Sequence, residues 1–239
     1  MTIMIEIKNV SKTYDGKKKA IDNLNFDIKD GEIFAFIGHN GAGKTTLIKS
    51  LVGILSFEEG DILINNKSIK ENPIGCKLDM AYVPDNPDLY ENMSAIDFIN
   101  FVCDMYDTSV EERKENIEKY AKMFEVDDKL KDDISSFSHG MKQKVALIAA
   151  LSHNPKVLVM DEPFVGLDPK SVYDMKELMK KMTKEGKTIF FSTHILDVAE
   201  KLCDRVAIIK NGKIVKIGKM KDIKGDSSLE KVFLELGEK

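Results

Sequence analysis

The sequence predicts an α/β fold with a mixed, mainly parallel β-sheet, an antiparallel β piece at the N-terminus and a helical insertion. Three observations support this prediction. Short apolar runs alternate with stretches of helical periodicity, as in proteins whose parallel strands are buried on both faces. Residues Ile3 to Val10 have apolar side chains at alternate positions. A long stretch near the middle of the chain carries amphipathic helical spacing.

Length and composition are those expected of a soluble globular protein with one large domain. The chain has 239 residues, of which 43% are hydrophobic and 32% charged, and its formal net charge is −4. This slightly acidic balance does not favour nucleic acid as a partner. The cysteines are three and scattered, which favours a reducing cytoplasm. No run approaches the roughly 18 apolar residues of a membrane helix, so any membrane role requires another polypeptide.

The N-terminal region is predicted to form an antiparallel β piece that leads into a buried strand. Residues Ile3 to Val10, Leu24 to Ile28 and Ile33 to Ile37 have strand patterns and are separated by Asp-Gly turn dipeptides. Tyr14 lies in the first turn. Its ring could stack on an adenine or simply cap the hairpin at the surface, and the sequence leaves both interpretations open.

The motif GHNGAGKTT, from Gly38 to Thr46, lies between the buried strand and a helix. Its glycines permit close backbone approach, so successive N–H groups can face an anion at the positive end of that helix. This is a P-loop, and it predicts a P-loop NTPase core. Lys44 should reach the β and γ phosphates, Thr45 should bind Mg²⁺, and Thr46 should contact the α or β phosphate. The expected cradle comprises Gly38, His39, Asn40, Gly41, Ala42, Gly43, Lys44, Thr45 and Thr46.

Two further apolar runs end in polar residues that should lie at the same edge of the sheet. Val157 to Met160 precedes Asp161 and Glu162. Asp161 is expected beside Mg²⁺, and Glu162 is expected to deprotonate the water that attacks the γ phosphate. Thr188 to Phe191 leads to His194, which should lie in the same crevice. An acidic turn and a structural histidine are the alternative interpretations.

The remaining pattern divides the chain into a core, an insertion and a tail. Ser138 suits the N-cap of a helix with Gly140 in its first turn, and such a helix start can bind an anion. Asn211 and Gly212 predict a type I′ hairpin turn, and Ser228 to Leu236 has the pattern of a short amphipathic helix. We therefore interpret residues 1–239 as a single domain, with a nucleotide-binding core at 1–88 and 135–220, a helical subdomain at about 89–134 and a C-terminal helix at 221–239.

Taken in order, these motifs resemble those of the nucleotide-binding subunits of ATP-binding cassette (ABC) transporters, over essentially the whole chain. The series comprises Tyr14 in the A-loop position, GHNGAGKTT as Walker A, FSHGMKQK as the signature, VLVMDEP as Walker B, GLD as the D-loop and STH as the switch histidine. The wording of YVPDNPDLYENMS and SHGMKQK resembles the subgroup of short ATPase subunits paired with a separate membrane protein. That subgroup is often linked to export, including resistance to peptide antibiotics.

The resemblance implies a mechanism that needs two such subunits, identical or different, packed head to tail. Each ATP would lie between the P-loop of one subunit and the signature of the other, where Ser138 and Gly140 would contact the γ phosphate. Glu162 would be the general base, His194 would contact the γ phosphate and the water, and Asp168 would link the two sites. The resemblance also implies an integral membrane transporter subunit as a partner, and a position at the cytoplasmic face of the cell membrane.

The sequence departs from the family pattern at several positions. Asp85 stands in the Q-loop where glutamine is expected, and its carboxylate could bind Mg²⁺, so we expect a stronger dependence on Mg²⁺. His139 and Met141 replace a glycine and a glutamine of the signature, which should alter packing at the γ phosphate. His39, where proline is common, is interpreted as a loop residue without a special role. The expected catalytic residues are Glu162, His194, Lys44 and Asp85, and the expected Mg²⁺ ligands are Thr45, Asp161 and Asp85.

Two other functions remain open at this point. A soluble ABC-type protein could act on ribosomes or DNA, although such proteins usually carry two cassettes or long coiled coils. A regulatory module could bind ATP without turnover, but the presence of Glu162 and His194 argues against it. A GTPase is disfavoured because no NKxD motif follows the P-loop.

Overall fold

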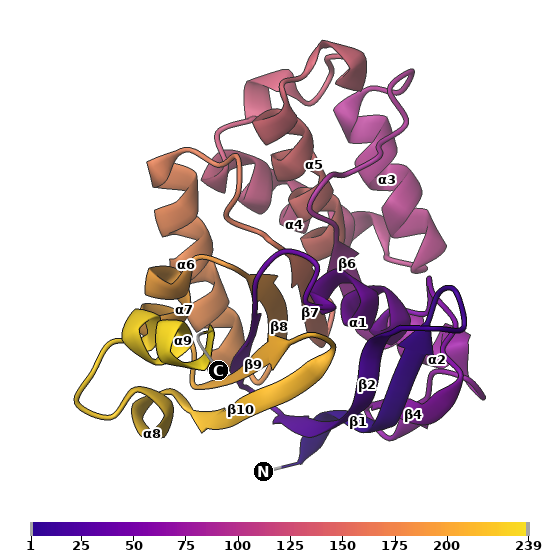
Figure 1. Cartoon of the computed structure of the whole chain (residues 1–239). Coiled ribbons are helices and arrows are strands. Elements are labelled where there is room, and N and C mark those ends of the chain that lie inside the picture. Colours follow the sequence, from indigo (N-terminus) through magenta and orange to yellow (C-terminus); the bar gives the residue numbers. More distant parts are fainter. Residues whose placement is uncertain (1, 238–239) are drawn as a thin grey trace.

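The structure is a computed structural model that describes residues 2–237. Its centre is a six-stranded sheet with the strand order β10-β9-β3-β8-β7-β6 (Figure 1). All neighbouring strands in it are parallel except β10, which is antiparallel to β9. The predicted mixed, mainly parallel sheet is therefore confirmed. Its strands are β3 (Ile33–Ile37), β6 (Met80–Val83), β7 (Val157–Asp161), β8 (Thr188–Thr193), β9 (Arg205–Lys210) and β10 (Lys213–Lys219).

A second, four-stranded sheet is antiparallel and confirms the predicted N-terminal β piece. Its order is β2-β1-β4-β5, and β1 pairs with both β2 and β4. The strand predicted at 24–28 begins earlier, because the chain pairs with β1 from Lys19 onward. The bounds are β1 (Ile3–Thr13), β2 (Lys19–Lys29), β4 (Glu59–Ile64) and β5 (Lys67–Ser68).

Strand β3 is buried at every residue because both of its faces are covered. Successive side chains of a strand point to opposite faces. Ile33, Ala35 and Ile37 belong to one apolar cluster, which also includes residues of α5 to α7. Phe34 and Phe36 belong to another, formed with α1 and the antiparallel sheet. The strand that leads into the P-loop therefore packs against one apolar cluster on each of its faces.

The helices fall into three groups. Helices α3 and α4 pack on α5 at the top of Figure 1, whereas α1 and α2 lie beside the antiparallel sheet and α6 to α9 lie at the left. The stretch predicted to be helical at about 89–134 contains α3 and α4, and its status as a separate subdomain stays a prediction. The bounds are α1 (Lys44–Leu51), α2 (Pro73–Asp79), α3 (Ala95–Met105), α4 (Val110–Met123), η1 (Asp127–Lys129), η2 (Ile134–Ser136), α5 (His139–Ser152), α6 (Pro169–Lys184), α7 (Leu196–Leu202), α8 (Met220–Lys224) and α9 (Leu229–Gly237).

The C-terminal part contains one confirmed turn and one correction. Asn211 and Gly212 have φ values of 49° and 77° between β9 and β10, as the predicted type I′ turn requires. The amphipathic helix expected at 228–236 is confirmed as α9, whereas the tail from residue 221 onward is not one continuous helix, because α8 and α9 are separate. Gly225 follows α8 with a φ of 54°, a conformation that does not continue a helix. Residues 238–239 lie outside the described part of the chain.

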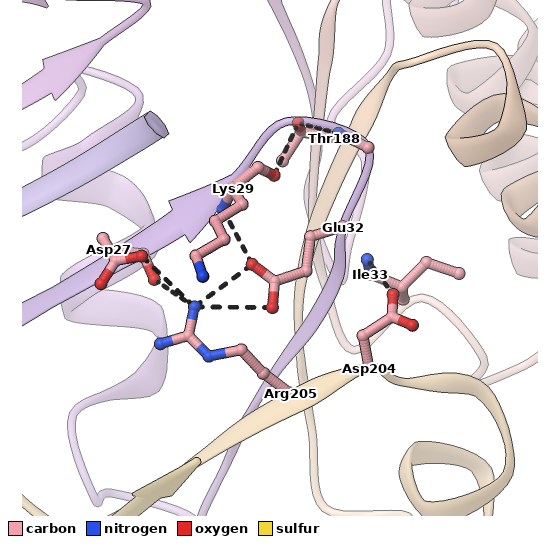
Figure 2. A network of polar contacts seen from close by, with 8 residues as sticks. Asp27, Lys29, Glu32, Ile33, Thr188, Asp204 and Arg205 are labelled. Atoms are coloured by element: carbon pink, nitrogen blue, oxygen red, sulfur yellow. Dashed lines mark hydrogen bonds and ion pairs between the residues drawn. The ribbon is translucent and has the colours of Figure 1, made fainter. Parts of the chain in front are cut away.

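An ion-pair network anchors the sheet at the end opposite the P-loop (Figure 2). Arg205 Nη1 donates to the carbonyl of Asp27 at 3.0 Å and lies 3.2 Å from Glu32 Oε2. The backbone N–H of Lys29 donates to the same carboxylate at 2.8 Å. Burial raises the pKa of Glu32, and the Lys29 N–H and Arg205 counteract this shift. The network joins β2 to the beginnings of β3 and β9, so it fixes the strand whose far end carries the P-loop.

Candidate functional site

The predicted site residues follow three strands that are neighbours in the central sheet. The P-loop follows β3, Asp161 and Glu162 lie at the end of β7, and His194 follows β8. Parallel strands place their carboxyl ends at one edge of a sheet, where ligands of α/β proteins bind. Strand order alone therefore assembles residues that are up to 156 positions apart, from Gly38 to His194.

Glycines let the P-loop lie tightly against neighbouring strands. A Cβ on Gly43, whose φ is 111°, would stand 2.5 Å from the carbonyl oxygen of Ala20. A Cβ on Gly38 would stand 2.7 Å from the carbonyl oxygen of Ile209. Neither position has room for a larger residue. The loop is therefore fixed by backbone contacts with β2 and β9 before α1 begins at Lys44.

Lys44 is held inside the loop. Its side chain is 6% exposed, and Nζ donates to the carbonyl oxygen of Gly38 at 2.7 Å and to that of His39 at 3.4 Å. Nζ also lies 3.2 Å from Oε1 of Glu162. These carbonyl and carboxylate oxygens take the acceptor role that phosphate oxygens would have. A buried ammonium that already faces oxygen acceptors suits the binding of a phosphate chain.

Glu162 connects Lys44 with His194. Its other oxygen, Oε2, lies 2.9 Å from Nδ1 of His194 and accepts the backbone N–H of that residue at 3.2 Å. The Glu162 side chain is 12% exposed, and its φ of 48° is in the left-handed region. Ser192 stabilises this turn, because its Oγ accepts the Glu162 N–H at 3.1 Å. The structure thus places the expected base between the expected lysine and the expected histidine.

Asp161 precedes Glu162 at the end of β7, and Asp85 lies close enough to both carboxylates to interact with them electrostatically. Asp161 is 3% exposed and accepts a hydrogen bond from the Ser192 hydroxyl. The residue Asp85 is exposed, yet the pKa of its carboxyl is raised, first by desolvation and then by Asp161 and Glu162. Within residues 2–237, no three His, Cys, Asp or Glu side chains form a metal site by themselves. A metal bound here would therefore also need hydroxyl or phosphate oxygens.

Tyr14 stands beside the P-loop with its ring largely in solvent. Tyr14 is 65% exposed, and its hydroxyl lies 3.2 Å from Oγ1 of Thr46. The hydrogen bond to the first helix was not anticipated from the sequence, since 32 residues separate the partners. It holds the ring next to the loop with much of its surface exposed, which suits contact with a planar ligand.

His39 contacts the C-terminal helix. Its ring lies against Phe233 of α9, with 4.6 Å between centroids and an interplanar angle of 53°. Lys210 Nζ adds a second contact by donating to the carbonyl oxygen of Leu236 at 3.0 Å. The interpretation of His39 as a loop residue without a role therefore missed a packing contact. Only the amphipathic tail hinted at it, and nothing in the sequence located its partner.

The signature and D-loop residues line a different hollow. Ser138 is the N-cap of α5, and its Oγ accepts the Met141 N–H at 3.4 Å. Asp168 caps α6 by accepting the Ser171 N–H at 2.9 Å, and it pairs with Lys144 at 3.1 Å. Among the described residues, none of the P-loop lines this hollow. Its lining comprises Ser138, His139, Gly140, Met141, Lys144, Gly166, Leu167 and Asp168.

Comparison with known proteins gives consistent results. A family model described as ABC transporter matches residues 21–165. An uncharacterized ABC transporter ATP-binding protein of Bacillus subtilis is 36% identical, over 93% of this chain and 72% of its own length. A lantibiotic transport ATP-binding protein of Streptococcus pyogenes is 34% identical, over 96% of both chains.

Solved structures give the same result. The structure of an ATP-binding subunit of an ABC transporter superposes with a TM-score of 0.93 and 32% identity, covering 98% of this chain and 99% of the other. A dimeric ATP-binding cassette in a post-hydrolysis state, bound to ADP and Pi, superposes with a TM-score of 0.83 and 28% identity. That alignment covers 91% of this chain and 99% of the other.

Proposed function

The chain belongs to the ABC transporter family as an ATP-binding and ATP-hydrolysing subunit, and from this premise we propose how its own residues carry out the reaction. ATP hydrolysis by this subunit powers transport through a separate membrane protein. The comparisons give no support to the alternative of a soluble regulatory or ribosome-associated protein.

We propose that the contacts of Lys44 with Glu162 and of Glu162 with His194 carry the hydrolysis. ATP supplies phosphate oxygens that replace Glu162 and the Gly38 carbonyl as acceptors for Lys44. The released Glu162 carboxylate then takes a proton from a water molecule. The water oxygen bonds to the γ phosphorus as the bond to ADP breaks. His194, now 2.9 Å from Glu162 Oε2, orients the base and contacts the γ phosphate.

The donor set fits Mg²⁺. The cation prefers oxygen ligands in an octahedral arrangement and keeps some of its waters. Asp161 is buried and oriented by Ser192, and Thr45 lies in the first turn of α1. We assign these two residues as ligands, and Asp85, which interacts electrostatically with Asp161, as a third that binds the cation directly or through a water molecule. When bound, Mg²⁺ offsets the negative charge of the phosphates and of this carboxylate group.

We expect Asp85→Gln to weaken the dependence of ATP hydrolysis on Mg²⁺. Without the cation, Asp85 adds a negative charge near Asp161 and Glu162, which disfavours ATP binding. The ratio of the rate at saturating Mg²⁺ to the rate at limiting Mg²⁺ should therefore be several-fold smaller in the uncharged variant. The measurement is ATPase rate against Mg²⁺ at constant ATP for both proteins, with Asp88→Asn as a control on the same segment. Coincident titrations would remove Asp85 from the metal site.

A single chain does not complete the site in this proposal. Ser138 and Gly140 line a hollow apart from the P-loop, and the N-terminus of α5 suits a phosphate. A second nucleotide-binding subunit packed head to tail would place this helix start on the γ phosphate of ATP held by the first. A similar cassette is dimeric with ADP and Pi bound. The adenine of that ATP would stack on Tyr14 of the first subunit, which lies beside the P-loop.

We place the membrane partner on the exposed face of α3. No helix within residues 2–237 could cross a bilayer. As in other members of the family, a membrane protein would contain the pathway, and the chain would bind it at the cytoplasmic face of the membrane. Phe101 and Met105 are 39% and 57% exposed on α3, and Tyr90 lies with its ring centroid 5.7 Å from that of Phe101. Exposed apolar groups of this kind mark interaction sites.

The similarity to a lantibiotic transport protein supports export of peptide antibiotics as the task.

Replacing Met105 with aspartate should uncouple the chain from its membrane partner. A carboxylate buried unpaired at the contact is strongly unfavourable, so roughly tenfold less chain should co-purify with a co-expressed membrane subunit. The ATPase rate of the isolated chain should not change. Val110→Asp is the control, because Val110 is 67% exposed at the start of α4. Equal recovery of both variants would refute the assignment of this face.

A further inference from the structure

One buried side-chain amide on helix α5 is only half satisfied. Gln143 on α5 is 2% exposed, and its Nε2 donates to the carbonyl oxygen of Pro163 at 3.3 Å. Its Oε1 is buried and has no hydrogen-bond partner among the described residues. A buried acceptor without a partner is unfavourable, because the oxygen has lost its hydrogen bonds to water. This cost suggests that the oxygen finds a donor in another state of the protein.

Gly166 lies directly beside the unsatisfied oxygen. A Cβ added to Gly166 would stand 3.6 Å from Oε1 of Gln143 and 2.9 Å from Cδ2 of His139. A Cβ on Gly140 would in turn stand 2.9 Å from the carbonyl oxygen of Gly166. The first turn of α5 therefore packs tightly against Gly166, and neither backbone segment can move far without displacing the other.

The same helix holds both ends of the segment 163–168. Gln143 binds the carbonyl of Pro163 at one end, and Lys144 pairs with Asp168 at 3.1 Å at the other. Pro163 directly follows Glu162, the proposed base. A displacement of α5 must therefore be transmitted to the residue next to the base.

We propose that Gln143 is a positioning residue that couples the start of α5 to Glu162. In the nucleotide-bound pair, Oε1 accepts a backbone N–H of the segment 163–168, and this bond fixes the peptide that follows Glu162. The proposal rests on the proposed function. In that arrangement the start of α5 contacts the nucleotide of the partner subunit, whereas Glu162 faces the nucleotide of its own P-loop. Gln143 therefore makes each base respond to occupancy of the other site.

The test is Gln143→Met, which keeps the approximate volume of the side chain and removes both polar groups. The melting temperature should change little, since the variant removes an unpartnered buried acceptor but also removes the donor of the Pro163 carbonyl. We expect kcat to fall about tenfold with KM for ATP unchanged, and the Hill coefficient for ATP to fall towards one. The matched control is Ser152→Ala, another buried polar residue of α5, whose Oγ bonds to the Ile148 carbonyl at 2.7 Å. This control should keep the wild-type kcat and Hill coefficient.

Three results would overturn the inference. A Gln143→Met protein with wild-type kcat and Hill coefficient would make the residue a packing element only. A lower melting temperature with unchanged activity per folded molecule would show a purely structural role. Wild-type protein without ATP hydrolysis would refute the proposed function and this inference with it, whereas the first two results leave that function intact.

Discussion

Replacing Glu162 with glutamine is expected to lower ATP hydrolysis on the order of 10²–10⁴-fold, the usual contribution of a general base. ATP binding should persist, because glutamine keeps the shape of the side chain and removes the charge that pairs with Lys44 at 3.2 Å. The lysine then has one competitor fewer for the phosphates. ATP bound without turnover should hold two subunits together, so the variant should accumulate as a dimer with ATP and Mg²⁺.

The measurement pairs steady-state ATPase rates with light scattering in the presence of ATP and Mg²⁺. Glu177→Gln is the matched control, because Glu177 is exposed on α6. Its Oε1 lies 2.9 Å from Nζ of Lys180 on the next turn of the same helix. A Glu162→Gln protein that stays monomeric would contradict the two-subunit mechanism. Equally low rates in the wild type and the variant would favour a nucleotide sensor over an ATPase.

Replacing Lys44 with methionine is expected to weaken ATP binding roughly 10- to 100-fold, since a buried hydrogen bond to a charged group contributes about 1.5–3 kcal/mol. Methionine retains most of the length of the stem but cannot donate. In the structure the ammonium is 6% exposed and faces oxygens of Gly38, His39 and Glu162. The variant leaves those acceptors without their donor, and it leaves the phosphates without a buried positive charge.

Isothermal titration with ATP measures this loss, and thermal unfolding shows whether the variant remains folded. Lys49→Met is the control, because Lys49 lies on the same helix α1 with an exposed side chain. It should bind ATP as the wild type does. Equal affinities of Lys44→Met and Lys49→Met would mean that the phosphate chain is bound elsewhere.

The sequence was informative where structure depends on near neighbours. The P-loop glycines, the Asn211-Gly212 turn and the Ser138 N-cap are each set by a few adjacent residues, and the structure contains the expected turn and cap. The buried strands were recognisable because parallel strands covered on both faces are apolar throughout. The amphipathic helix of the tail was recognisable from its own residues, but the separate short helix α8, which packs on β10 and α9, was not.

The site itself shows a sharper division. By itself, the sequence determined which side chains could bind phosphate, carry a base or ligand a cation, because these capacities belong to residue types and short spacings. Only the tertiary structure decided that Lys44 pairs with Glu162, that His39 contacts Phe233, and that Gln143 lies buried beside Gly166. Such contacts join residues far apart in the chain. They depend on strand order and on which helix face is buried, and no local pattern encodes either.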